Sequence, residues 1–232
     1  MIREVSLEEI SDGRLYGSND MVKADCGDCK GCSACCRSMG DSIVLDPLDV
    51  FRLSEGLHQT FEQLLAGGVA LHVEGGIILP NLKMAGEAEC CSYLDEAGRC
   101  SIHGFRPGIC RLFPLGRYYE GNTFRYFLQV HECRNQNRTK VKVRKWIDTP
   151  ELVQYERFVC DWHYFLKDLQ QSLQTVDRGK EGDGTGFSEQ RAKELSMYVL
   201  KLFYMIPFEK NISFYVQFAE RLAQARDVCG LE

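Results

Sequence analysis

The sequence predicts an α+β fold in which a small, irregular, cysteine-rich core with short hairpins and helices precedes a helical C-terminal region. Cysteine is concentrated between Cys26 and Cys133, where turn residues interrupt the chain at short intervals. After Cys133, apolar residues recur at helical spacing. We therefore expect a lead-in segment over 1–25, a cysteine-rich domain over 26–135, and a helical region over 136–232 that packs on the core.

The lead-in segment is predicted to be short and partly ordered, because glycine and other turn residues punctuate it. A helix is expected from Asp46-Pro47, since aspartate is a good N-cap and proline a good first helical residue. It should end near Gly56. A second short helix is expected over 60–66, stopped by Gly67-Gly68.

Three hairpins are predicted further along the chain. The first covers 69–82 and turns at Gly75-Gly76, a pair that lacks the spacing of a phosphate-binding loop. The second is small, turns over 95–98 and carries a cysteine at each base. The third covers 117–130. Between the last two, Pro107 and Pro114 bracket Cys110 and place it in a short, stiff element.

Helices are expected to make up the last third of the chain. Thr149-Pro150-Glu151 marks a helix start, and apolar residues from Leu152 to Leu169 form a stripe at helical spacing. A polar, glycine-rich linker follows over 179–186. Two more helices are predicted over 188–205 and 211–228.

A dense cysteine run, Cys26 to Arg37, contains five cysteines in twelve residues, four of them at every third position. Such C-x-x-C steps let several thiolates converge on one inorganic centre, and the small intervening residues allow the backbone to wrap closely. Buried core thiols do not explain this density. A disulfide framework needs an oxidising compartment, and cysteines three apart are poorly placed to pair. The run therefore indicates metal or cluster binding.

The charge and the apolar content of the chain indicate which partners and which cellular compartment to expect. The net charge of −5 argues against nucleic acid as a bulk electrostatic partner. The charged N-terminus has no signal-peptide core, and no stretch of about 18 apolar residues predicts a membrane span. We expect a cytoplasmic protein with no nucleic-acid or membrane partner, whose thiols stay reduced.

The residues leave the number and type of metal open. Adjacent cysteines, as at 35–36 and 90–91, diverge and are poorly placed to bind the same atom. Iron–sulfur proteins use one dense run with a distant cysteine, whereas zinc modules use two paired knuckles. His103 and His131 are weaker candidates. Arg106 and Arg111 flank the cysteines and are predicted to support the negative charge of a bound cofactor.

The combined spacing resembles the CxxCxxCC family, described as a zinc- or iron-chelating domain. Its motif is matched by the run from Cys29 to Cys36, by Cys91, by Gly98-x-Cys100, by Arg106-Pro107-x-x-Cys110 and by a late Cys133. The resemblance covers roughly residues 26–135 and leaves Cys26 and Cys90 as extras. It implies eight metal ligands: Cys29, Cys32, Cys35, Cys36, Cys91, Cys100, Cys110 and Cys133.

Some relatives in that family are named flagellin lysine-N-methylases, which use S-adenosylmethionine and carry an iron–sulfur cluster. No glycine-rich methyltransferase loop stands in this sequence. We expect an iron–sulfur cluster of the [4Fe–4S] type, with a redox or enzymatic role that includes protein lysine methylation. S-adenosylmethionine is implied by the resemblance only, and the protein substrate or redox partner is unknown. The alternatives are a zinc-stabilised, non-catalytic binding module and a metal storage or delivery protein.

Overall fold

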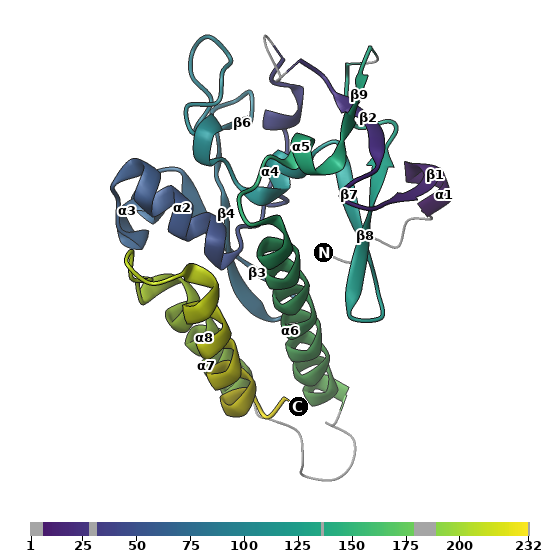
Figure 1. The fold of residues 1–232 in the computed structure, drawn as a ribbon. Helices are drawn as coiled ribbons and strands as arrows, with labels where there is room; N and C mark the ends of the chain where they lie inside the picture. The colour runs from purple at the N-terminus through teal and green to yellow at the C-terminus, as the bar shows by residue number, and fades with distance from the viewer. Residues whose placement is uncertain (1–6, 28–31, 136, 179–188, 232) are drawn as a thin grey trace.

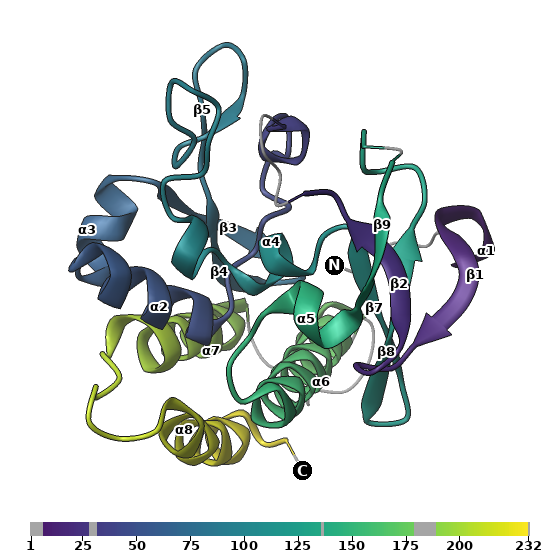
Figure 2. The same cartoon turned by 45° about the horizontal axis from the view of Figure 1, so that its top comes forward.

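A computed structural model describes residues 7–27, 32–135, 137–178 and 189–231, and it confirms the α+β class and the helical C-terminal region. The long helix α6 (Leu152–Arg178) runs through the middle of the molecule (Figure 1). Short helices and strand pairs that include the cysteine-bearing segments lie beyond its N-terminal end. The C-terminal helices lie beside α6, as a second view also shows (Figure 2).

The N-terminal segment contributes more structure than a partly ordered lead-in. After α1 (Leu7–Ile10), strand β1 (Ser11–Tyr16) joins a sheet of order β1-β8-β7, in which β7 (Leu115–Glu120) and β8 (Thr123–Gln129) form the predicted third hairpin. Strand β2 (Met21–Asp25) pairs antiparallel with β9 (Thr139–Lys142). Both partners of these early strands come from far along the chain, so local sequence carries little sign of them.

Helices α2 (Pro47–Leu57) and α3 (Phe61–Ala66) begin where the sequence predicts. Each starts with a capping box, in which the N-cap side chain and the side chain three residues later accept from each other's backbone N–H. Asp46 and Asp49 form the box of α2, and Thr60 and Gln63 that of α3. The predicted first hairpin is β3 (Val69–Glu74) with β4 (Ile77–Leu82).

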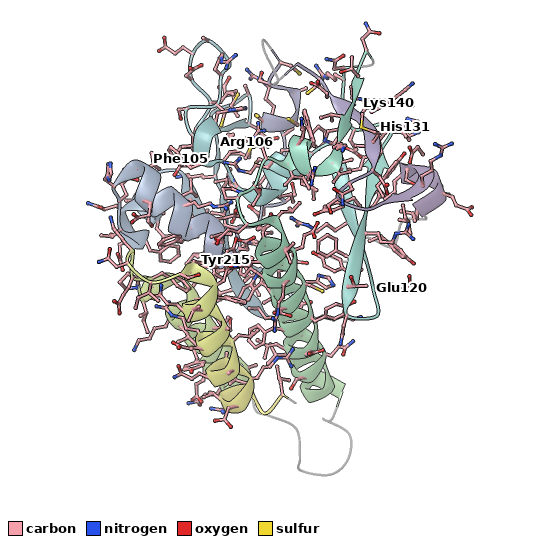
Figure 3. The ribbon with its side chains drawn as sticks, viewed as in Figure 1. Phe105, Arg106, Glu120, His131, Lys140 and Tyr215 are labelled. Atoms are coloured by element: carbon pink, nitrogen blue, oxygen red, sulfur yellow. The ribbon has the colours of Figure 1, made fainter. Side chains whose placement is uncertain are left out.

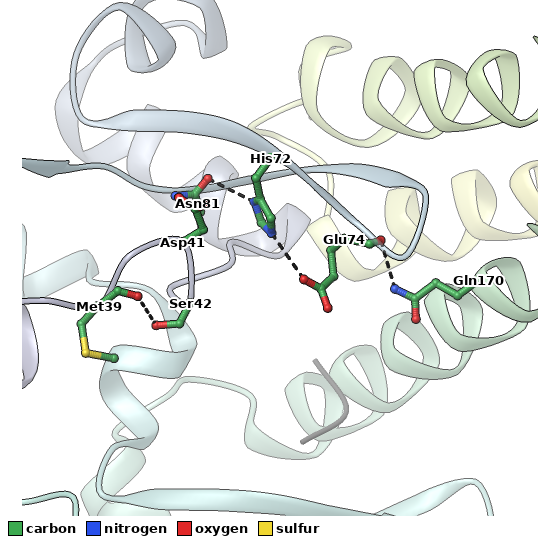
Figure 4. Close-up of polar contacts among 7 residues, drawn as sticks. All are labelled: Met39, Asp41, Ser42, His72, Glu74, Asn81 and Gln170. Atoms are coloured by element: carbon green, nitrogen blue, oxygen red, sulfur yellow. Dashed lines mark hydrogen bonds and ion pairs between the residues drawn. The ribbon is translucent and has the colours of Figure 1, made fainter. Parts of the chain in front are cut away.

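Polar contacts tie this hairpin to the chain that follows the cysteine run and to α6 (Figure 4). The Asn81 side chain is almost fully buried, and its Nδ2 donates to Oδ1 of Asp41 at 3.3 Å. Its Oδ1 lies 3.1 Å from His72 Nδ1. At the turn, Gln170 Nε2 donates to the backbone oxygen of Glu74 at 3.2 Å. The hairpin is thereby fixed at both ends.

The predicted second hairpin is smaller than expected. Strand β6 (Cys90–Cys91) pairs with β5 (Met84–Ala85), upstream of it, and a single bridge between Leu94 and Cys100 closes the turn over 95–98. A 3-10 turn, η2 (His103–Phe105), and helix α4 (Gly108–Leu112) follow. Cys110, which was expected in a short, stiff element, sits in this short helix. Helix α5 (Val143–Ile147), which the sequence did not predict, packs beside α4.

The C-terminal region is helical, with α7 (Glu189–Leu200), the π-helix η4 (Lys201–Met205) and α8 (Phe214–Cys229). The expected linker over 179–186 lies outside the described residues. Aromatic rings from α6, η4 and α8 pack on one another: Phe158, Trp162, Phe165, Phe203 and Phe218. Tyr204 joins this layer to the segment before α2 by donating to the Leu45 carbonyl at 3.0 Å. Within the described residues, none of the helices has the length and apolarity to cross a bilayer.

Candidate metal centre

Sulfur atoms gather at the end of the molecule where the 3-10 turn η1 (Ala34–Cys36) and β6 lie (Figure 3). The chain leaving η1 forms an antiparallel bridge from Arg37 to Cys90, and Ser38 N donates to Glu89 O at 2.8 Å. On the other side of η1, a Cβ placed on Gly98 would lie 3.8 Å from Ser33 Oγ. The end of the dense run is thus held between β6 and the turn that precedes Cys100.

Five thiols from three separate segments meet here, and we call them the central thiol group. The thiol of Cys110 has a pKa raised first by burial and then by the nearby charge of Asp49. The charges of three other thiols raise it further, in the order Cys91, Cys100, Cys35. A hydrogen bond with Cys36 is the largest cause that raises the pKa of Cys35. The group is Cys35, Cys36, Cys91, Cys100 and Cys110.

Arginine side chains reach this group. The charge of Arg106 favours the thiolate forms of Cys35 and Cys100. It acts against the stronger effects that raise their pKa, which are the hydrogen bond with Cys36 and burial for Cys35, and burial for Cys100. Nη1 of Arg106 lies 2.6 Å from Nε2 of His103, and this contact restrains the guanidinium. At the rim, Nη1 of Arg37 lies 2.6 Å from Sγ of Cys90. Positive charge close to several thiolates offsets their mutual repulsion.

Arg111 contacts the backbone of the loop instead of a thiol. Its guanidinium donates to the carbonyl oxygens of Gly104, Arg106 and Asp148, and its side chain is buried. Arg111 therefore holds the loop that carries Arg106 against α5. Any support that it gives to a bound cofactor acts through that loop.

Cys110 is held from both ends of α4. Near the N-terminus, the buried carboxylate of Asp49 accepts from Gly108 N at 2.7 Å. At the C-terminus, Nε1 of Trp146 donates to the carbonyl oxygens of Leu112 and Phe113 at 3.3 and 3.2 Å. This helix cannot shift without breaking these bonds, so the position of Cys110 is set by the fold. Sequence reasoning missed Asp49, whose only signal is its place in a capping box.

A second set of thiols lies where β2 meets β9, and we call it the lateral thiol group. Cys133 is buried, and its pKa is raised first by burial and then by the charge of Cys26, with a smaller contribution from Cys32. Asn135 Nδ2 donates to the backbone oxygen of Cys26 at 3.3 Å. The backbone of Cys26, which the family resemblance leaves as an extra, is thus tied to the chain two residues beyond Cys133.

The remaining candidates fall outside both groups. Cys29 lies outside the described residues. His131 is exposed and lies near Lys140, at the end of the molecule that carries β9 (Figure 3). Cys160 lies on α6, where its Sγ donates to Asn122 O at 3.1 Å, and Cys229 ends α8. Neither contributes to a thiol group.

The donor set suits a soft metal. None of the cysteines that the structure describes forms a disulfide, and thiolates favour zinc and iron–sulfur clusters over hard cations. Among the described His, Cys, Asp and Glu side chains, no three already surround one point at ligating distance. Binding at either group would therefore require its thiols to move closer together than they lie in this structure.

Comparison with protein families matches residues 28–148 to CxxCxxCC, a putative zinc- or iron-chelating domain. The chain belongs to this family. The match covers about half of the chain and includes both thiol groups apart from Cys26. It ends just after α5, so the helices that follow are not part of the shared domain. Neither the search of curated proteins nor that of solved structures found a match. The chain thus carries a metal-binding domain of the zinc- or iron-chelating type.

Proposed function

We propose that the central thiol group binds an iron–sulfur cluster and that this cluster gives the protein a redox or enzymatic role. The supporting observation is the meeting of five thiols from three segments beside the Arg106 guanidinium. A dense run combined with remote cysteines is typical of cluster ligation. A [4Fe–4S] cluster needs four of these five thiols. One of the adjacent residues Cys35 and Cys36 would supply a ligand, and the other would lie beside the cluster without binding it.

The protein's own residues have distinct roles in this proposal. Cys91, Cys100 and Cys110 supply thiolates from elements fixed by the fold. Arg106 lowers the cost of gathering them by placing a positive charge beside Cys35 and Cys100. The cluster, when bound, supplies electron transfer or radical chemistry that these side chains cannot perform. A reducing compartment such as the cytoplasm suits partly exposed thiolates.

Protein lysine methylation is the specific enzymatic activity that we propose, by analogy with family members named flagellin lysine-N-methylases. S-adenosylmethionine would then be the second cofactor, and a protein side chain the acceptor. This part of the proposal rests on the family alone. Binding of S-adenosylmethionine to the purified protein, measured by calorimetry, tests it directly, and absence of binding in the cluster-loaded protein would refute it.

A zinc-stabilised, non-catalytic binding module is the alternative. Four cysteines from separate segments can close a tetrahedral zinc site, and α4 holds Cys110 in one position, as a structural site needs. In that case the domain would present a surface to a partner protein. Loss of its zinc would unfold the part of the chain around η1, β6 and α4.

One measurement separates these functions: iron, zinc and acid-labile sulfide per chain, on protein purified without air. Iron with an equal amount of sulfide supports the cluster, whereas zinc without sulfide refutes it and favours the binding module. Cys100→Ser should lower the bound metal. Cys229→Ser is the matched control, because Cys229 is a thiol remote from both groups, and it should leave the metal content unchanged.

A further inference from the structure

The hairpin of β3 and β4 is covered along only one of its two edges. On the β4 side, Ile78 N donates to Ser196 Oγ of α7 at 2.7 Å. Leu82 N and Pro80 O make hydrogen bonds of 3.0 and 2.8 Å with the segment that precedes α2. On the β3 side, no strand among the described residues pairs with the hairpin, which remains a two-stranded sheet. Within that part of the chain, the outer edge of β3 is open.

The register shows which backbone groups of β3 point to this edge. In an antiparallel pair, residues opposite each other either exchange both N–H···O bonds or turn these groups away from each other. The residues of β4 that bond outward lie opposite three residues of β3, which are Val69, Leu71 and Val73. The N–H and C=O groups of these three residues therefore point away from β4, toward the open edge.

The side chains of this edge are apolar and partly exposed. Leu71 is 41% exposed and Val73 is 67% exposed. Edge strands that avoid pairing with other chains carry lysine or proline, contain a bulge or are very short. Strand β3 has six residues in unbroken register with β4 and contains neither lysine nor proline. Its one acidic residue, Glu74, lies at the end of the strand, where its Oε2 is 3.9 Å from His72 Nε2.

The edge is complementary to a second copy of itself. Antiparallel pairing centred on Leu71 places this residue opposite the Leu71 of the other copy, and Val73 opposite Val69. The outward N–H and C=O groups then meet as hydrogen-bonded pairs, and apolar side chains lie side by side across the two strands. Glu74 faces Gly68 in this register, so no like charges meet. A two-fold axis through Leu71 thus satisfies every outward group that the register identifies.

We propose that β3 is a self-association surface, through which two copies of this chain join antiparallel into one sheet of order β4-β3-β3-β4. A sheet of more than two strands is also more stable than an isolated hairpin. One strand pair covers less surface than the roughly 1,200 Å² of a standard interface, so the dimer should be weak and form reversibly as concentration rises. The inference goes beyond the proposed function and does not depend on what the thiol groups bind.

Analytical ultracentrifugation of the full-length protein over a range of concentrations tests this surface, in a reducing buffer that excludes intermolecular disulfides. We expect the wild type to pass from monomer to dimer. Leu71→Lys and Leu71→Glu should each stay monomeric, because like charges would face each other across the axis. An equal mixture of these two variants should dimerise again, since opposite charges then meet. Val153→Lys changes an 81% exposed side chain on α6 and is the matched control, which should associate as the wild type does.

The outcomes separate this inference from the proposed function. A wild type that stays monomeric at every concentration would overturn the inference, and the edge would then be left to a strand of another protein. Dimers in Leu71→Lys as stable as those of the wild type, or a mixture that fails to dimerise, would overturn it as well. Val73→Pro is a second test if the Leu71 variants do not fold, because it removes an N–H that the ladder with β4 does not use, and it should abolish the dimer. The metal and sulfide content of the variants, which reports on the proposed function, should equal that of the wild type.

Discussion

Substitution of Asp49 tests how strongly the fold holds helix α4, which carries Cys110. The Asp49 side chain is 2% exposed and accepts two backbone hydrogen bonds, from Gly108 N at 2.7 Å and from Asp46 N at 3.2 Å. Asp49→Ala removes both acceptors. The carboxylates of Asp46 and Asp49 both lie close to Arg52 and Arg117, and the substitution removes one of them.

The expected loss of stability follows from these bonds. A buried N–H left without a partner costs about 1–3 kcal/mol, which applies to Gly108 N. The lost half of the capping box adds about 0.5–1.5 kcal/mol. We therefore expect Asp49→Ala to lower the free energy of unfolding by about 1.5–4.5 kcal/mol. Metal affinity should fall too, because Cys110 is then held less firmly.

Urea unfolding at a fixed free metal concentration, followed by the fluorescence of Trp146 and Trp162, measures the change. The structure supplies a matched control in Gln63→Ala. Gln63 occupies the same position in the capping box of α3, but it is exposed and lies at the surface. Gln63→Ala should lower the free energy of unfolding by no more than about 1 kcal/mol. Equal losses in the two variants would refute the argument that the buried contact to α4 carries the effect.

Three further substitutions test other parts of the structure. Burial lowers the pKa of His163 to about 4, whereas the same side chain in the unfolded protein has a pKa of about 6.5. Between these pH values the unfolded chain binds a proton that the folded chain does not, so the free energy of unfolding falls as the pH is lowered from about 6.5 to 4. His163→Phe keeps a ring stacked on Tyr119 and should lose less stability on acidification than the wild type, as measured by urea unfolding across that range. Gly108→Ala would drive a methyl group into the hydroxyl of fully buried Tyr155, and a loss of about 1–3 kcal/mol is expected in the same assay. Phe165→Ala, in the aromatic layer of α6, should cost about 3–5 kcal/mol, and a smaller loss would mean that the helices repack.

Elements with local signals were predicted well from the sequence. The capping residues of α2 and α3 mark their starts, and Gly75-Gly76 marks the turn of the first hairpin. The apolar stripe of α6 was read from its 3.6-residue period. In each case the residues that decide the structure lie within a few positions of one another.

The parts that sequence did not reveal depend on distant partners. Strand β2 shows buried Val22 and Ala24 at alternate positions, but five residues with one exposed Met give a weak signal. The division of the cysteines between two groups follows from the direction of the chain through η1, which spacing alone does not determine. The contact from Asp49 to α4 likewise joins residues 59 positions apart.

The order in which the chain is made bears on how its thiols are protected. Cys26 emerges from the ribosome before its contact Asn135, which lies 109 residues further along. At ordinary rates of synthesis the delay is on the order of ten seconds. During that interval β2, which leads into the dense run, lacks its partner strand β9, and the thiols of the run face solvent, open to oxidation or to capture of whatever metal is present. Delivery of metal to the domain must therefore compete with these reactions, or follow the arrival of β9, when Cys26 first meets the chain that carries Cys133.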